Sequence, residues 1–170
     1  MNQFPYDAVI FDLDGTLFDA EDGIVSSVVS AMEELELPIP EDADLRLVVG
    51  PPLLDSFRNL LRIPEDRLDE AVESYKRHFA EEGMYRYQVY PHIRSILRML
   101  REGGVHVGLA TSKDRNIANR VMDYFGLSHY FDAIVGENVD SVKLGKPELI
   151  RRALPEKYRC AAMVGDRCFD

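Results

Sequence analysis

The sequence has little cysteine, little positive charge and no long apolar run. Its two cysteines, Cys160 and Cys168, match no zinc-binding spacing, and we interpret them as reduced thiols of a cytoplasmic protein. No apolar stretch approaches the length of a membrane span, and the first residues show no basic segment followed by an apolar one. These absences predict a cytoplasmic protein with no zinc site, no signal peptide and no membrane partner.

The charge balance narrows the class of partner further. The chain has 20 basic and 30 acidic residues and a formal net charge of -10, which argues against nucleic acid as a main partner. An acidic protein that binds a phosphorylated small molecule needs a local cation or a metal ion to do so. The length of 170 residues is enough for one sizeable core, or for a core with a small satellite domain.

Short apolar segments alternate with helical patterns at both ends of the chain. Alternating strands and helices with short turns predict an α/β fold, whose parallel sheet has right-handed crossovers. The expected strands are 8–11, 105–110, 132–136 and 160–164, and the expected helices are 91–102, about 114–125 and 147–154.

The middle of the chain has a different pattern, because residues from about 20 to 84 show helical spacing and no strand signal. A first helix is expected over 21–36, where prolines at 38 and 40 stop it, and a later one begins near Pro64. We predict that residues 19–85 form a helical domain inserted into a core built from residues 1–18 and 86–170.

Polar residues follow three of the expected strands. Asp12 follows the first strand, Thr111 the second and Asp166 the last. Taken singly these residues have ordinary interpretations, since Asp-Gly is a turn signal and Asp or Thr often caps a helix. In a parallel sheet, however, the carboxyl ends of the strands lie along one edge, so the three side chains are expected to converge.

Two further residues complete this group: Asp14, two residues after Asp12, and Lys146, in a loop expected at the same edge. Carboxylate oxygens are the ligands that Mg²⁺ prefers, and lysine and hydroxyl groups bind phosphoryl oxygens. The pattern therefore predicts a combined magnesium and phosphate site.

Four motifs give this pattern a more specific meaning. They are FDLDGTLFD at 11–19, LATSK at 109–113, GKPE at 145–148 and VGDRCFD at 164–170. In order and spacing the chain resembles the haloacid dehalogenase superfamily of phosphohydrolases, most closely its phosphoglycolate-phosphatase-like members. The resemblance implies a Rossmann-like, doubly wound parallel sheet with an inserted all-helical cap.

The resemblance also implies roles for single residues. Asp12 resembles the nucleophile that forms an aspartyl-phosphate, and Asp14 resembles the general acid and base. The implied Mg²⁺ ligands are Asp12, the backbone carbonyl of Asp14, Asp166 and Asp170. The implied phosphate-binding residues are Gly15, Thr111, Ser112 and Lys146.

The implied activity is magnesium-dependent hydrolysis of a small phosphorylated metabolite, with a phosphoglycolate-like ester as the expected substrate. Nucleotide or pyrophosphate hydrolysis stays open, because the cap sequence does not reveal the ester, and a monomer and a homodimer are both compatible with the sequence. Phosphoglucomutase-like transfer is disfavoured, since those relatives usually read D-x-D-G-V with a histidine soon after. A non-enzymatic phospho-acceptor is disfavoured by Asp14 and by the helical insertion.

Some features stay without an assigned role. Residues 50–52, Gly-Pro-Pro, look like the family's loop that reaches over the active site, whereas Arg58 is interpreted as a solvated helix residue rather than a substrate contact.

Family members normally continue for several tens of residues past the last motif. We therefore expect a C-terminal segment of the core to be missing, which would expose the edge of the strand that ends at Val164.

Overall fold

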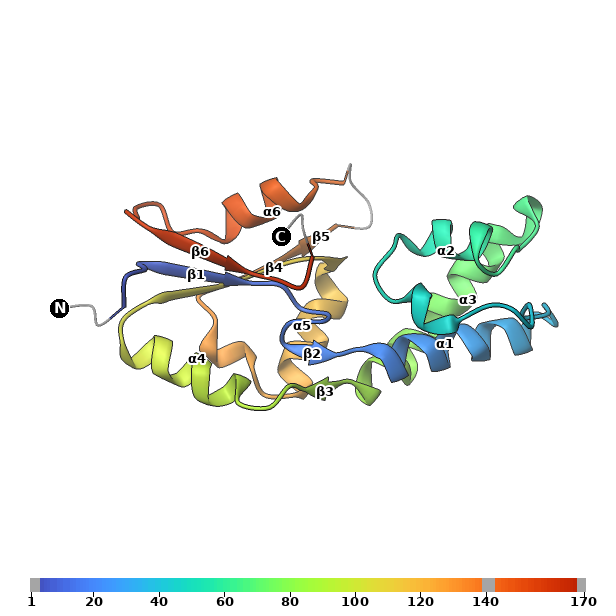
Figure 1. Ribbon diagram of the computed structural model, residues 1–170, viewed down its shortest axis with the longest axis horizontal. Helices are drawn as coiled ribbons and strands as arrows, with labels where there is room; N and C mark the ends of the chain where they lie inside the picture. The colour runs from blue at the N-terminus through green and yellow to red at the C-terminus, as the bar shows by residue number, and fades with distance from the viewer. Residues whose placement is uncertain (1–3, 139–142, 168–170) are drawn as a thin grey trace. The chain divides into compact units, whose positions relative to one another are not determined.

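The computed structural model describes residues 4–138 and 143–167. The chain divides into two compact units: a core unit, Met1–Asp19 with Val89–Asp170, and a helical unit, Ala20–Gln88. Figure 1 labels the α-helices and β-strands of both units.

A parallel sheet forms the centre of the core unit. Within the described residues its order is β5-β4-β1-β6. All residues of β1 are buried, as expected for a strand covered on both faces. The parallel α/β architecture predicted from the alternating pattern is confirmed. The strands are β1 (Ala8–Phe11), β4 (His106–Asp114), β5 (Ala133–Glu137) and β6 (Ala161–Val164).

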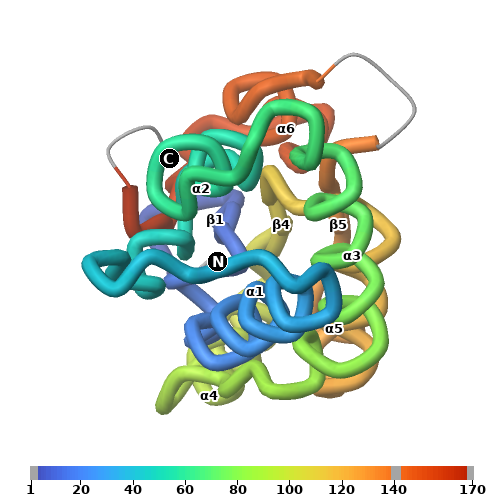
Figure 2. The backbone as a smooth tube through the Cα atoms, turned by 90° about the vertical axis from the view of Figure 1, so that its right-hand side faces the viewer, coloured from blue at the N-terminus to red at the C-terminus, as the bar shows by residue number. Residues whose placement is uncertain are grey.

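Helices cover both faces of this sheet. Helix α6 (Lys146–Ala153) lies on one side, and α4 (Ile93–Glu102) and α5 (Arg115–Tyr124) lie on the other (Figures 1 and 2). The side chains of Leu149 and Ala153 are fully buried in one cluster with Ile10 of β1 and Ala110 of β4, and this packing holds α6 against the sheet. A short 3-10 helix, η4 (Ser128–Tyr130), leads into β5.

The helical unit has its own apolar core. Tyr75 and Phe79 of α3 (Leu68–Glu81) stack with ring centroids 5.7 Å apart, and Phe57 of α2 (Leu53–Asn59) packs edge-on against Tyr75 at 6.0 Å. In the part of the chain that the structure describes, no helix is long and apolar enough to cross a membrane. The elements are α1 (Glu21–Glu34), η1 (Leu45–Val48), α2 (Leu53–Asn59), η2 (Glu65–Arg67), α3 (Leu68–Glu81) and η3 (Gly83–Arg86).

Three details differ from the sequence-based expectation. Strand β4 does not end before Thr111 but continues to Asp114, and its register against β5 shifts between Ala110 and Asp114. Lys146 is the first residue of α6 and does not lie in a loop. Two short strands, β2 (Phe18–Asp19) and β3 (Gln88–Val89), pair where the chain crosses the boundary between the units. Two-residue strands are too short to show an alternating pattern.

Candidate active site

The first motif forms a tight loop directly after β1. The backbone N–H of Asp12 donates to the carbonyl of Val164 at 2.9 Å, so the pairing with β6 continues past the end of β1. Gly15 then turns the chain with a φ of +80°, a conformation that favours glycine. A Cβ at this position would lie 2.5 Å from a carboxylate oxygen of Asp166. Glycine is therefore required both by the turn and by the close approach of that carboxylate.

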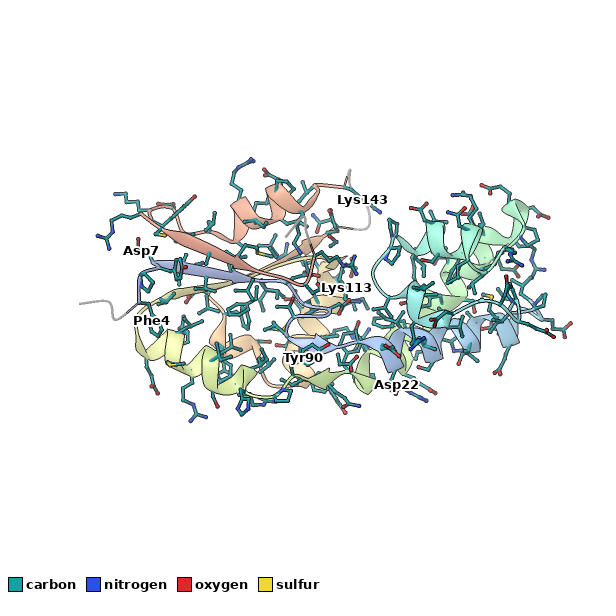
Figure 3. All side chains as sticks on the ribbon, viewed as in Figure 1. Phe4, Asp7, Asp22, Tyr90, Lys113 and Lys143 are labelled. Carbon is teal, nitrogen blue, oxygen red and sulfur yellow. The ribbon has the colours of Figure 1, made fainter. Side chains whose placement is uncertain are left out.

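Each aspartate of the motif is paired with a different lysine. The Nζ of Lys146 lies 2.8 Å from Oδ1 of Asp12, and both side chains are almost completely buried. The Nζ of Lys113 lies 3.0 Å from Oδ2 of Asp14. Lys113 lies near the end of β4, whereas Asp7, just before β1, marks the opposite end of the sheet (Figure 3). Two carboxylates and two ammonium groups thus meet at the carboxyl edge of the sheet.

The second motif, LATSK at 109–113, lies within β4, because this strand continues to Asp114. Thr111 is buried, and its Oγ1 accepts a hydrogen bond from the backbone N–H of Lys113 at 3.2 Å, whereas Ser112 is exposed. Neither residue caps α5, because the side chain of Asp114 accepts hydrogen bonds from the N–H groups of Asn116 and Ile117. The hydroxyl and ammonium groups of the second motif therefore remain at the sheet edge.

The structure brings most of the predicted site residues together. Asp12, Asp14 and Gly15 come from the β1 loop, Thr111 from β4 and Lys146 from α6, and the Asp166 carboxylate lies against Gly15. Asp170, the remaining predicted Mg²⁺ ligand, lies outside the described residues.

The donor set fits a hard divalent cation. Oδ1 of Asp14 and Oγ1 of Thr16 are buried without a hydrogen-bond partner within residues 4–138 and 143–167, so this loop holds polar atoms that protein groups do not satisfy. No group of three metal-binding side chains is found within those residues. The expected set, however, includes a backbone carbonyl and Asp170. Oxygen donors of this kind suit Mg²⁺.

Two charged residues of the site were not assigned a role from the sequence. Lys113 was part of the LATSK motif, and its place two residues after Thr111 in an extended segment was the available signal, because alternate residues share a side of a strand. Glu137, the last residue of β5, is buried and binds the loop before Lys146. No sequence signal pointed to this contact, since it depends on the path of the chain between β5 and α6.

Comparison with protein families agrees with this geometry. The model of the haloacid dehalogenase-like hydrolase family matches residues 9–170. The chain belongs to this family. A 5'-nucleotidase of Pseudomonas aeruginosa is 36% identical over 168 residues, which cover 97% of this chain and 76% of that protein. The tyrosine-protein kinase PtkA of Mycobacterium tuberculosis is 34% identical over 168 residues, which cover 95% of this chain and 56% of PtkA.

Solved structures of haloacid dehalogenase-like proteins share the fold. A predicted phosphatase from Clostridium acetobutylicum superposes with a TM-score of 0.81 at 35% identity, over 97% of this chain and 78% of that one. Among other relatives, a pyrophosphatase PpaX of Halalkalibacterium halodurans is 32% identical over 95% of this chain and 75% of its own length. A phosphoglycolate phosphatase of Aquifex aeolicus is 29% identical over 93% and 75%. The protein is a haloacid dehalogenase-like hydrolase with phosphatases among its relatives.

Proposed function

We propose that the protein is a magnesium-dependent phosphatase that hydrolyses a small phosphomonoester through an aspartyl-phosphate on Asp12. The observation that carries this proposal is the pair of aspartates at the carboxyl edge of the sheet, each in contact with its own lysine. A carboxylate that serves as nucleophile and a second one that moves protons are what two-step phosphate hydrolysis requires.

In the first step an oxygen of Asp12 forms a bond to phosphorus while the ester P–O bond breaks. Asp14 donates a proton to the leaving oxygen, which departs as an alcohol. Carboxylate and phosphate repel each other, and the Lys146 ammonium, 2.8 Å from Asp12, offsets this repulsion. The same ammonium is placed to stabilise the charge that spreads over the phosphoryl oxygens in the transition state.

In the second step a water molecule attacks the phosphorus of the aspartyl-phosphate. Asp14, now a carboxylate, takes a proton from this water, and Asp12 is regenerated as inorganic phosphate leaves. The buried Thr111 and the backbone at Gly15 lie at the same edge of the sheet, and we assign them to the phosphoryl oxygens, with Ser112 and Lys146.

Magnesium would be held by Asp12, the backbone carbonyl of Asp14, Asp166 and Asp170. When bound, the ion supplies positive charge that lets an anionic nucleophile approach an anionic phosphate. Asp12 and Asp14 pair with lysines, and Oδ2 of Asp166 lies 3.9 Å from Nε of Arg167, so a divalent cation would add the positive charge that an incoming phosphate requires.

For the substrate we propose a phosphoglycolate-like ester. The names of the relatives, 5'-nucleotidase, pyrophosphatase and phosphoglycolate phosphatase, share transfer of a phosphoryl group to water and differ in the leaving group. The name of PtkA supports a second candidate, in which the aspartyl-phosphate would pass its phosphoryl group to a tyrosine hydroxyl in place of water.

The test is a phosphate-release assay with the purified chain and Mg²⁺. The panel contains p-nitrophenyl phosphate, phosphoglycolate, sugar phosphates, nucleoside monophosphates and pyrophosphate, with a tyrosine peptide as an alternative acceptor. We expect turnover that EDTA abolishes and added Mg²⁺ restores, with the highest kcat/KM for phosphoglycolate. Absence of turnover on every ester would overturn the proposal, and labelling of the peptide from a phosphoryl donor would favour the kinase alternative.

A further inference from the structure

Glu137 occupies an unusual position for a carboxylate. It is the last residue of β5 and is 9% exposed, although nothing in the proposed chemistry uses it. It lies beside the second motif, because its register partner in β4 is Asp114. Strand β5 ends and α6 begins at the same end of the sheet (Figure 1). A buried carboxylate is costly unless hydrogen bonds satisfy it, so its contacts indicate its role.

Both oxygens of Glu137 bind the segment that leads into α6. Oε2 accepts a hydrogen bond from the backbone N–H of Leu144 at 2.9 Å, and Oε1 accepts one from that of Gly145 at 3.1 Å. Hydrogen bonds from two consecutive amides to one carboxylate fix the direction of the backbone as well as its position.

Gly145 adopts φ +76° and ψ 156°, a conformation close to exclusive to glycine. A Cβ at Gly145 would meet no atom within 4 Å. Glycine is therefore required here by the backbone conformation and not by a lack of space for a side chain. This turn is what places the next residue, Lys146, at the start of α6 with its side chain buried and its Nζ on Asp12. The buried Leu149 and Ala153 anchor the rest of the helix.

We propose that Glu137 is a positioning residue that holds the Lys146 ammonium in place for phosphoryl transfer. It fixes the two residues immediately before Lys146 and so sets the point from which the lysine side chain reaches Asp12. The inference rests on the proposed function for its effect on catalysis, but not for its effect on Lys146 itself.

The main experiment compares Glu137→Gln in two backgrounds, wild type and Lys146→Met. Glutamine keeps the size of the side chain but replaces one acceptor oxygen with a donor, so one of the two backbone amides loses its partner. We expect kcat to fall by about 10-fold to 10²-fold with little change in KM, because a small displacement of a reacting group is enough for such a loss. In the Lys146→Met background the same substitution should cost little more, since it acts through the lysine.

Asp132→Asn is the matched control. Asp132 directly precedes β5 at its other end, and its Oδ2 accepts a hydrogen bond from the backbone N–H of Val107 at 2.9 Å. It thus resembles Glu137 as a carboxylate that binds a backbone amide of a neighbouring segment, but it has no contact with Lys146. We expect Asp132→Asn to lower the melting temperature while kcat stays near the wild-type value.

A second readout does not depend on phosphatase activity. The rate at which an amine-reactive reagent modifies Lys146, followed by peptide mass spectrometry, should rise in Glu137→Gln and not in Asp132→Asn, because the wild-type ammonium is buried. If the wild type hydrolyses no ester, the proposed function fails, and this labelling alone decides the role of Glu137. Should Glu137→Gln not fold, Glu137→Asp, which shortens the reach by one methylene, replaces it in both measurements.

Three results would overturn the inference. The first is an equal loss of kcat from Glu137→Gln in both backgrounds, and the second is an equal loss of kcat in Asp132→Asn. The third is unchanged labelling of Lys146 in the Glu137 variant.

Discussion

The ion pairs at the candidate site of the core unit and those on the surface of the helical unit lie in very different surroundings. In the core unit the side chains of Lys146 and Asp12 are 7% and 11% exposed. In the helical unit those of Arg62 and Asp42, which pair at 2.6 Å, are 63% and 66% exposed. The two distances are similar, so geometry alone does not distinguish a pair at the candidate site from a pair on the surface.

Burial changes how much an ion pair contributes to the stability of the fold. Exposed pairs are screened by water and salt and contribute little to stability, so they arise freely on a charged surface. Removing two charges from water is expensive, and apolar residues of similar volume often fold as well or better. A buried pair is therefore better explained by chemistry than by stability. On this basis substitutions in the ion pairs of the candidate site should change turnover, and those in the exposed pairs of the helical unit should change stability slightly or not at all.

The largest effect is expected from Asp12→Asn. Removing the nucleophile should lower kcat by on the order of 10⁴-fold to 10⁶-fold and abolish the acid-stable phosphorylated protein. Because asparagine has nearly the same shape, the far-ultraviolet circular dichroism spectrum should stay that of the wild type. Phosphate release and acid-quench labelling measure the effect. Asp42→Asn, in the exposed pair with Arg62, is the control and should leave turnover unchanged. Near-normal turnover in Asp12→Asn would refute the assignment of the nucleophile.

A smaller loss is expected from Lys113→Met, because Lys113 pairs with the proposed acid-base residue Asp14, whereas Lys146 pairs with the proposed nucleophile Asp12. Proton donation matters most for poor leaving groups, so kcat should fall by about 10-fold to 10²-fold on an alkyl phosphate and less on p-nitrophenyl phosphate. Both rates are measured with the same enzyme preparation.

Lys76→Met provides the matched control, since Lys76 pairs with Glu73 on the exposed side of α3. Its kcat should equal that of the wild type on both esters. An identical loss on both esters in Lys113→Met would show that Lys113 does not act through proton transfer.

The same contrast explains how far the sequence could be interpreted. The parallel α/β fold was predictable because an apolar strand followed by a polar residue is a local pattern, and so is the spacing of a helix. Lys146 is part of the GKPE motif, which the sequence shows directly. Its place at the start of α6 could not be predicted, because no local pattern reveals the contact between Glu137 and the two residues before Lys146. The contact of Glu137 with Leu144 and Gly145 joins segments that come together only in three dimensions.

In the helical unit the sequence predicted helices and little else. No motif marks the contact between Glu34 of α1 and α3, where Arg77, Ser74 and His78 surround the carboxylate. These residues are 40 or more positions apart from Glu34, and their types are those of any charged helix surface. Charged residues on exposed helices carry no signal of their partners, whereas charged residues after a buried strand are conspicuous.

The contact at Glu34 predicts a pH-dependent stability of the helical unit. Hydrogen bonds from Arg77, then Ser74 and His78, lower the pKa of Glu34 from 4.5 to about 2. Because the folded-state pKa is depressed, the contact stabilises the fold fully above pH 4.5 and loses this contribution as the pH falls toward 2. In urea titrations the wild type should exceed Glu34→Gln in unfolding free energy at pH 7, and the difference should shrink below pH 4.5.

A neighbouring acid supplies the control for this series. Glu33 lies next to Glu34 on α1 but does not belong to the contact with Arg77, Ser74 and His78, so Glu33→Gln should show no comparable difference at any pH. A difference between wild type and Glu34→Gln that stays constant from pH 7 to pH 3 would contradict the role of the ionised carboxylate.

The smallest effect is expected at Arg58, which the sequence favours as a solvated helix residue over a substrate contact. Its guanidinium binds Glu65 through two hydrogen bonds, of 2.8 Å from Nη2 and 3.0 Å from Nε, and both side chains are exposed. A guanidinium already held by a carboxylate must give up that partner to bind a substrate. Arg58→Ala should therefore leave KM unchanged both for phosphoglycolate, which has an anionic tail, and for p-nitrophenyl phosphate, which has none. Arg62→Ala, in the exposed pair with Asp42, should behave in the same way. A rise in KM for phosphoglycolate alone, in Arg58→Ala but not in Arg62→Ala, would show that Arg58 binds the substrate and is more than a partner in a surface ion pair.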